Sequence, residues 1–188
     1  MGLPEYSVHM TEIGTEIGTE RLIMRGWREA DLEPWAAMNA DPRVRRYVGP
    51  LLSFEQAEAW ALNYQDDLDR YGYGLWALEV RETGEFIGFT GLHALDDESP
   101  VTGVELAWRL ARPAWGHGYA TEAGLAALDY GFGSLGLAEV VAVTMARNLR
   151  SQAVMERVGM TRDPAGDFLD PDVDEGALRR HVVYRKRG

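Results

Sequence analysis

The segment from residue 103 to residue 121 constrains the fold more than any other part of the chain. Its first eight residues, GVELAWRL, alternate in the period-two pattern that predicts a strand. Pro113 then removes a backbone donor and ends regular pairing, and Gly116 and Gly118 stand directly before a helical pattern. The segment therefore predicts a strand, a tight turn and a helix whose free N–H groups and dipole attract an anion.

The two faces of this predicted strand differ in size and polarity. The face expected in the core holds large apolar side chains, namely Val104, Leu106, Trp108 and Leu110. The opposite face holds small and charged residues, namely Gly103, Glu105, Ala107 and Arg109. Small residues beside a carboxylate leave room for a ligand to lie against the strand. By themselves the two glycines also fit a plain turn, because Thr121 stands where a dinucleotide fingerprint has its third glycine.

Similar patterns recur along the rest of the chain. The expected strands are residues 22–24, 75–81, 85–91, 103–110, 139–145 and 180–186. Asp31 is expected to cap a first helix, and Ser53 begins a capping box for a second. A third helix is expected to place Leu125, Leu128 and Phe132 on one face, and a fourth covers about residues 149–157.

This order of segments predicts one α/β domain over residues 20–188, with a mixed, mostly antiparallel sheet and helices on both faces. Residues 1–19 contain a repeated T-E-I-G tetrapeptide without a clear period and are predicted to be a flexible N-terminal arm. No apolar run approaches the roughly 20 residues that span a bilayer, and no signal peptide is recognisable. We therefore expect a cytoplasmic protein.

Composition excludes several kinds of chemistry. The chain has no cysteine, so disulfides, thiolate nucleophiles and cysteine-bound zinc are ruled out, and no metal site is expected. The lone lysine, Lys186, lies in a terminal basic run where a phosphate-loop lysine is not expected. With 19 Lys and Arg against 30 Asp and Glu, the formal net charge is −11. That balance disfavours nucleic acid and is compatible with a cationic small molecule.

Two motifs in sequence resemble those of the GNAT N-acetyltransferases. Residues 115–123, WGHGYATEA, are similar to the family's acyl-CoA pyrophosphate motif, although Trp115 replaces its usual polar first residue. Residues 147–160, RNLRSQAVMERVGM, are similar to the later motif of the family. The resemblance covers roughly residues 20–186, and both motifs are similar to the ribosomal-protein N-terminal, or Rim-type, branch.

The resemblance implies that acetyl-CoA lies in a gap between two parallel strands that splay apart, residues 103–110 and 139–145. It implies that the backbone of Leu110 and Arg112 binds the pantetheine arm. The pyrophosphate would be held by consecutive N–H groups, those of Gly116, His117, Gly118, Tyr119, Ala120 and Thr121. Trp115 would pack beside the cofactor as an apolar lip. Such a cofactor needs no lysine and brings its own thiol.

The resemblance also implies catalytic residues, each with a structural alternative. Glu105 is the candidate general base, directly or through a water; alternatively it pairs with an arginine such as Arg109. Met155 stands where many relatives have the tyrosine that protonates the leaving thiolate. Ser151 is therefore the candidate hydrogen-bond donor to the sulfur, or else simply a small residue beside the cofactor. Asn148 would bind the pantetheine or acetyl end, cap the next helix, or do both.

The predicted function is transfer of an acetyl group from acetyl-CoA to a primary amine, on a protein N-terminus or a small molecule. An antibiotic or polyamine acetyltransferase and a non-catalytic acyl-CoA-binding sensor are alternatives. The expected partner is a small-molecule or peptide amine, without nucleic acid or membrane, and a homodimer is left open. An acidic segment, residues 163–175, would attract an amine if it lay over the acceptor channel, or would serve only solubility.

Overall fold

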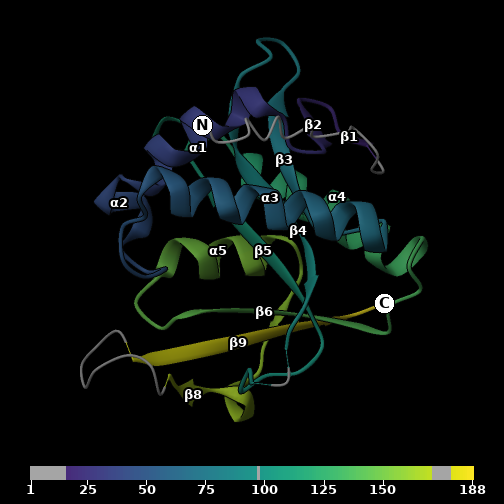
Figure 1. Cartoon of the computed structure of the whole chain (residues 1–188). Helices are drawn as coiled ribbons and strands as arrows, with labels where there is room; N and C mark the ends of the chain where they lie inside the picture. Colours follow the sequence, from purple (N-terminus) through teal and green to yellow (C-terminus); the bar gives the residue numbers. More distant parts are fainter. Residues whose placement is uncertain (1–15, 97, 171–178) are drawn as a thin grey trace.

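The computed structural model of the protein describes residues 16–96, 98–170 and 179–188. Within these ranges one mixed sheet has the strand order β1-β2-β3-β4-β5-β6-β9-β7, and β8 pairs with β9 (Figure 1). The strands are β1 (Ile17–Gly18), β2 (Leu22–Arg25), β3 (Leu75–Val80), β4 (Phe86–Ala94), β5 (Val104–Leu110), β6 (Glu139–Met145), β7 (Thr161–Arg162), β8 (Phe168–Leu169) and β9 (Arg180–Arg187). The helices are α1 (Leu32–Asn39), α2 (Pro42–Arg45), α3 (Phe54–Tyr71), α4 (Tyr119–Gly133) and α5 (Leu149–Arg157). The predicted α/β class with a mostly antiparallel sheet is confirmed.

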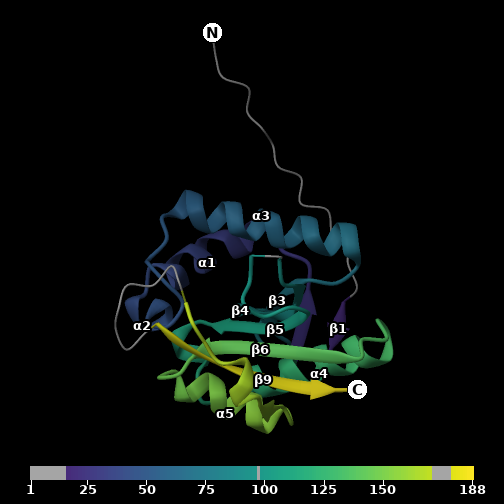
Figure 2. The same ribbon diagram turned by 90° about the horizontal axis from the view of Figure 1, so that it is seen from below.

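The helices form two layers, one on each face of the sheet. Figure 2 shows α1 and α3 on one side and α4 and α5 on the other. The long helix α3 starts at the expected capping box, in which Ser53 and Gln56 bond each other's backbone, and it ends at Gly72 in the left-handed region. Trp27 and Trp35 are completely buried on the α1 and α3 side, in edge-to-face contact with each other.

Helix α4 packs on the sheet through small side chains rather than through the large apolar face expected. Its buried positions are mainly small residues, namely Ala123, Gly124, Ala127, Leu128 and Gly131. A Cβ atom at Gly131 would lie 2.8 Å from Leu92 Cδ1, so the helix is too close to the sheet for a larger residue. Leu125, which was expected on one face with Leu128, is 40% exposed while Leu128 is buried, because close approach through small residues sets the helix rotation.

The sheet begins before the predicted domain boundary at residue 20. Ile17 and Gly18 form β1, which pairs antiparallel with β2, so residues 16–19 do not belong to a free arm. The remaining part of the predicted arm, residues 1–15, lies outside the described residues. In the described part of the chain, no helix is long and apolar enough to cross a membrane.

Strands β5 and β6 are parallel neighbours that separate after a single pair, Glu105 with Val141. In the antiparallel β4–β5 ladder, residue pairs that exchange backbone hydrogen bonds alternate with pairs that do not. At the end of the ladder, the N–H of Ala111 donates to the carbonyl of Ile87. The alternation turns the backbone groups of Trp108 and Leu110 away from β4, toward the side on which β6 departs. Unpaired peptide groups therefore border a gap between two parallel strands.

Candidate active site

A groove of about 1060 Å³ opens at this gap, bounded by β5, the loop into α4, helix α5 and the turn after α2. It brings together most of the predicted site residues, namely Leu110, Arg112, Trp115, Gly116, Gly118, Tyr119, Ala120, Thr121, Asn148 and Ser151. The side chain of His117 does not line it; it is exposed and stacked on Tyr119. Trp108 does line it and is only partly buried, which corrects its expected place in the core.

The loop before α4 has the conformation of an anion-binding nest. Gly116 and Gly118 have φ values of +84° and +82°, in the left-handed region that L side chains rarely adopt. After Trp115, the first N–H groups that form backbone hydrogen bonds are those of Thr121 and Glu122, and both donate to the carbonyl of Gly118. The preceding N–H groups of the loop and first helical turn therefore remain available, at the positive end of a helix of 15 residues.

Trp115 closes one side of the groove and is held from three directions. Its indole N–H donates to the carbonyl of Leu110 at 2.8 Å. The guanidinium groups of Arg112 and Arg150 stack on its ring, 5.0 and 4.8 Å from the ring centre. Because the Leu110 carbonyl is occupied, only the N–H of Leu110 is left to face the groove.

Asn148 caps α5 and orients Ser151. Its Oδ1 accepts from the Ser151 N–H at 3.4 Å, which agrees with the predicted capping role. Its Nδ2 donates to the hydroxyl oxygens of Thr144 and Ser151, each at 2.9 Å. Since the Ser151 oxygen already accepts a hydrogen bond, its own proton is free to be donated into the groove. Met155 is fully buried beneath α5, so it presents nothing to the groove.

Glu105 lies where β5 and β6 begin to separate. Its Oε1 accepts from the backbone N–H of Val143 on β6 at 3.1 Å, and its Oε2 lies 2.8 Å from Nε2 of His93 on β4. The alternative partner expected from the sequence, Arg109, is therefore not the one it has. Burial disfavours the charged form of His93, but the hydrogen bond and negative charge of Glu105 outweigh it and raise the His93 pKa above 6.5.

A family model described as an acetyltransferase (GNAT) domain matches residues 21–161, which include this groove from β5 to α5. The chain belongs to the GNAT acetyltransferases. A Bacillus subtilis relative named as an uncharacterized N-acetyltransferase, YoaA, is 31% identical over 170 residues, 87% of this chain and 86% of its own. The protein is an acetyl-CoA-dependent acetyltransferase, as expected from its two motifs.

Solved structures share the fold of this GNAT domain. An acetyltransferase from Agrobacterium tumefaciens is 29% identical, with a TM-score of 0.76, over 93% of this chain and 95% of its own. RimJ of Mycobacterium smegmatis, solved with CoA-disulfide, is 20% identical with a TM-score of 0.73, over 92% of this chain and 87% of its own. The predicted likeness to the Rim-type branch is thus confirmed as a likeness of fold.

The GNAT groove is strongly positive although the whole chain is acidic. Seven arginines line it, namely Arg43, Arg46, Arg109, Arg112, Arg147, Arg150 and Arg157, and none of the described lining residues is acidic. Together with the free N–H groups of the nest, this surface fits the phosphates of coenzyme A. The sequence predicted the nest from its glycines, and of these arginines only Arg112 was a predicted site residue, because they come from three separate segments.

The described part of the acidic segment lies away from this groove. Asp163 forms an ion pair with Arg185 of β9, and Asp167 pairs with Arg162 of β7. Residues 171–178 of the segment lie outside the described residues. Asp163 and Asp167 thus neutralise arginines of the β7–β9 edge and do not line this groove.

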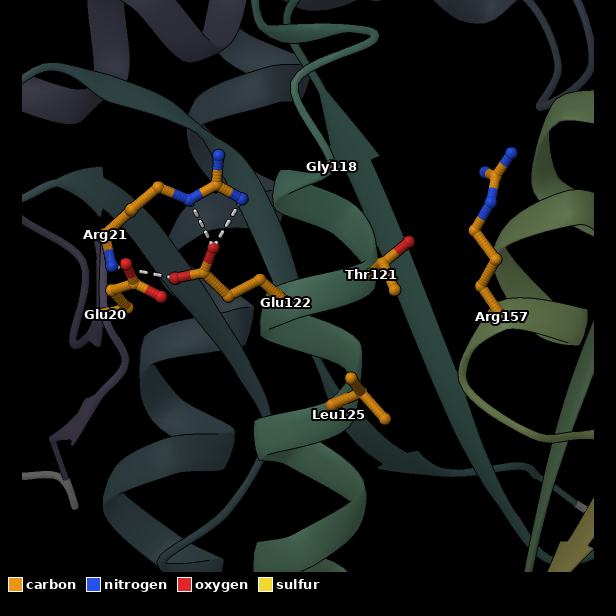
Figure 3. Close-up of a pocket in the computed structure, with 7 residues that line it drawn as sticks. All are labelled: Glu20, Arg21, Gly118, Thr121, Glu122, Leu125 and Arg157. Carbon is orange, nitrogen blue, oxygen red and sulfur yellow. Dashed lines mark hydrogen bonds and ion pairs between the residues drawn. The ribbon is translucent and has the colours of Figure 1, made fainter.

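A second hollow, of about 570 Å³, lies beside the first turn of α4. Figure 3 shows Glu122 joined to Arg21 there, with Thr121 and Arg157 on the other side of the helix. Glu122 accepts from the Arg21 backbone at 2.8 Å and from its side chain at 2.7 Å, while Arg21 Nη1 donates to the carbonyl of His117 at 3.0 Å. These contacts tie the nest to β2.

The substitution Glu122→Gln is expected to loosen this anchor. Burial opposes ionisation of Glu122, but hydrogen bonds from Thr19 and Arg21 outweigh it and lower its pKa below 4.5. Because the pKa of Glu122 is lower in the folded state, its stabilising effect is fully present above pH 4.5. The effect is lost as the pH falls through the folded-state pKa. We expect the free energy of unfolding to fall by about 1 kcal/mol at pH 7, which lowers Tm by about 2–4 °C. We also expect the KM for acetyl-CoA to rise.

Thermal unfolding of both proteins over a pH series measures this effect. The difference in Tm between wild type and Glu122→Gln should shrink as the pH is lowered below 4.5. Glu82→Gln, in the β3–β4 turn, serves as the control, because the Glu82 carboxylate forms no hydrogen bond or ion pair in the described chain. A constant difference at every pH would show that the charge of Glu122 does not contribute.

Proposed function

We propose that the protein transfers the acetyl group of acetyl-CoA to a primary amine, with Glu105 as the general base. The observation that carries the proposal is the position of Glu105 at the point where β5 and β6 separate, beside the groove that holds the anion nest. The carboxylate is fixed there by the Val143 N–H and by His93. A base held rigidly where the gap begins suits an amine that must lose a proton before attack.

Each residue at the gap has a defined task in this proposal. Glu105 takes the proton of the acceptor ammonium on a lone pair left by its two hydrogen bonds, directly or through a water. His93 orients the carboxylate and, when protonated, balances its charge. The N–H groups of Trp108 and Leu110, together with the Arg112 backbone that the resemblance implies, bind the pantetheine arm. The free N–H groups of the nest, from Gly116 to Ala120, hold the pyrophosphate.

Ser151 donates a hydrogen bond to the sulfur that leaves the acetyl group. Asn148 supports this role, because its donation to the Ser151 oxygen leaves only the serine proton to point elsewhere. We expect Ser151→Ala to lower kcat about tenfold, the size of one hydrogen bond to a developing negative charge, with a smaller effect on the KM for acetyl-CoA. Steady-state kinetics of thiol release measure both constants.

Ser151→Thr is the matched variant, since it keeps the hydroxyl at the same position of α5. It should retain more activity than Ser151→Ala. Equal kcat values in the alanine variant and the wild type would exclude the hydrogen bond to sulfur.

A panel of amines tests the proposed reaction itself. Thiol release from acetyl-CoA is followed with peptides that begin with Ala, Ser or Thr, with lysine peptides, polyamines, aminoglycosides and amino acids. Amine-dependent release with acetylated product, seen by mass spectrometry, supports the proposal. A non-catalytic sensor would bind acetyl-CoA in calorimetry and release no thiol with any acceptor, which would overturn it.

A further inference from the structure

Arg109, which lines the groove, and Arg45, which approaches the same asparagine, have no carboxylate partner among the described residues. Arg109 of β5 donates from Nη1 to Asn39 Oδ1 at 2.9 Å, and its Nε is buried without a hydrogen-bond partner among the residues that the structure describes. Arg45 of α2 is 3% exposed and approaches the same Asn39 oxygen at 3.5 Å. Arg45 Nε also donates to the Pro50 carbonyl at 2.7 Å, so in the described chain these two positive charges meet only neutral oxygens, and burial lowers the pKa of Arg109 to about 10.

Arg25 is a buried arginine away from the groove, and it is paired with carboxylates. It is 5% exposed, close to the exposure of Arg45, yet it bonds Asp31 at 2.7 and 2.9 Å and Glu79 at 2.8 Å. Removing a guanidinium from water without a counter-charge is costly, so buried arginines are normally paired. The absence of such a pair at Arg109 and Arg45, in the described chain, leaves a place for an anion supplied from outside.

Aromatic rings hold the Arg109 side chain in position at the groove. Its guanidinium carbon lies 5.5 Å from the ring centre of Trp35, 5.6 Å from Trp60 and 5.4 Å from Phe89. The guanidinium carbon of Arg45 also lies over the ring of Trp60, 5.3 Å from its centre. Packed in this way, Arg109 has little rotamer freedom to lose when it binds a ligand, and its Nη2 makes no hydrogen bond in the described chain.

The position of Arg109 separates it from the phosphates of the cofactor. Its side chain contacts residues of α1, α3 and β4, on the sheet face that carries Glu105. The anion nest belongs to the start of α4, the helix that covers the other face (Figure 2). An anion at Arg109 would therefore sit on the base side of the β5–β6 gap, where the acceptor must approach.

We propose that Arg109, backed by Arg45, binds an oxyanion of the acceptor, so that the substrates are amines that also carry a carboxylate or a phosphate. The inference rests on the proposed acetyl transfer to an amine. It reverses the preference for cationic acceptors that the net charge of −11 favours, because the local field of the groove is set by its arginines.

Matched acceptor pairs test the proposal through the kcat/KM for thiol release. The peptide amide Ala-Asp-NH₂ is compared with Ala-Asn-NH₂, phosphoethanolamine with ethanolamine, and spermidine serves as the polycation. We expect the wild type to prefer an anionic member by tenfold or more, and Arg109→Gln to bring that ratio close to one. The aspartyl and phosphate pairs show which oxyanion is recognised. Arg109→Lys should be intermediate, since it keeps the charge without the planar fork.

Arg70→Gln is the matched control, because Arg70 is an exposed arginine of α3 that pairs with Asp66. It should keep the wild-type preference. A wild type that favours spermidine or the neutral members, or a preference that survives in Arg109→Gln, would overturn the proposal. If Arg109→Gln fails to fold, the wild-type ratios and Arg109→Lys decide the outcome.

A binding measurement separates this proposal from the proposed reaction. With coenzyme A at saturation, succinate or inorganic phosphate should raise the Tm of the wild type and of Arg70→Gln, but not that of Arg109→Gln. If no amine is acetylated and this pattern is still seen, the reaction is wrong and the anion site stands. If amines are acetylated but neither anion raises the wild-type Tm and no pair shows a preference, the anion site is wrong.

Discussion

Replacing Glu105 with glutamine is expected to lower kcat by about 100-fold to 10,000-fold at neutral pH, the usual contribution of a general base. The amide occupies the same volume but cannot accept the proton of an ammonium group. Glu105 does not line the cofactor groove, so the KM for acetyl-CoA should change little. Steady-state thiol release over a pH series, together with calorimetric binding of acetyl-CoA, measures the two effects separately.

His93→Gln is the informative companion to this substitution. It removes the imidazole that lies 2.8 Å from the carboxylate while leaving the Val143 N–H bond in place. We expect a smaller loss than in Glu105→Gln, because the base itself remains. Unchanged turnover of Glu105→Gln across the pH range would remove Glu105 from the role of base.

Replacing Ala120 with glutamate is expected to raise the KM for acetyl-CoA by about 100-fold or more. Ala120 is the second residue of α4 and lines the groove at the nest. A carboxylate there would occupy the free N–H groups and repel the pyrophosphate, and two unit charges 4 Å apart interact by about 4 kcal/mol at an effective dielectric constant of 20. The folded protein should not lose stability through charge, since acidic residues favour a helix N-terminus.

Ala120→Gln has nearly the same shape without the charge, so it reports the steric part of the effect. We expect its KM to lie well below that of Ala120→Glu, and we expect similar Tm values for both variants. A normal KM in Ala120→Glu would place the pyrophosphate elsewhere. A similar rise in both variants would mean that space, rather than charge, limits binding.

Local patterns predicted most of the architecture because they depend on residues close together in sequence. The capping box at Ser53 placed the start of α3, and the alternation of residues 103–110 placed β5. Gly116 and Gly118 predicted the nest for the same reason, since a positive φ is a property of one residue. Glu105 and Ser151 were found by resemblance, and their roles stay predictions that the kinetics above will test.

The features that differed from expectation depend on contacts between distant segments. Trp108 borders the groove instead of the core, because β6 moves away from β5 there and leaves that edge open. Glu105 pairs with His93 instead of Arg109, because the register of β4 against β5 places His93 directly opposite. Neither outcome follows from the period of a single strand.

The amino-acid sequence by itself determined the order of the main strands and helices, the anion nest and the family, since each is encoded in short, local patterns. The tertiary structure alone decided the electrostatic character of the site. It gathers seven arginines from separate segments into one groove of an acidic chain, and it buries Arg45 and Arg109 beside Asn39 without a carboxylate. The electrostatic potential at a site depends on how far each charged group lies from it, and the net charge of −11 gives only the sum of those charges.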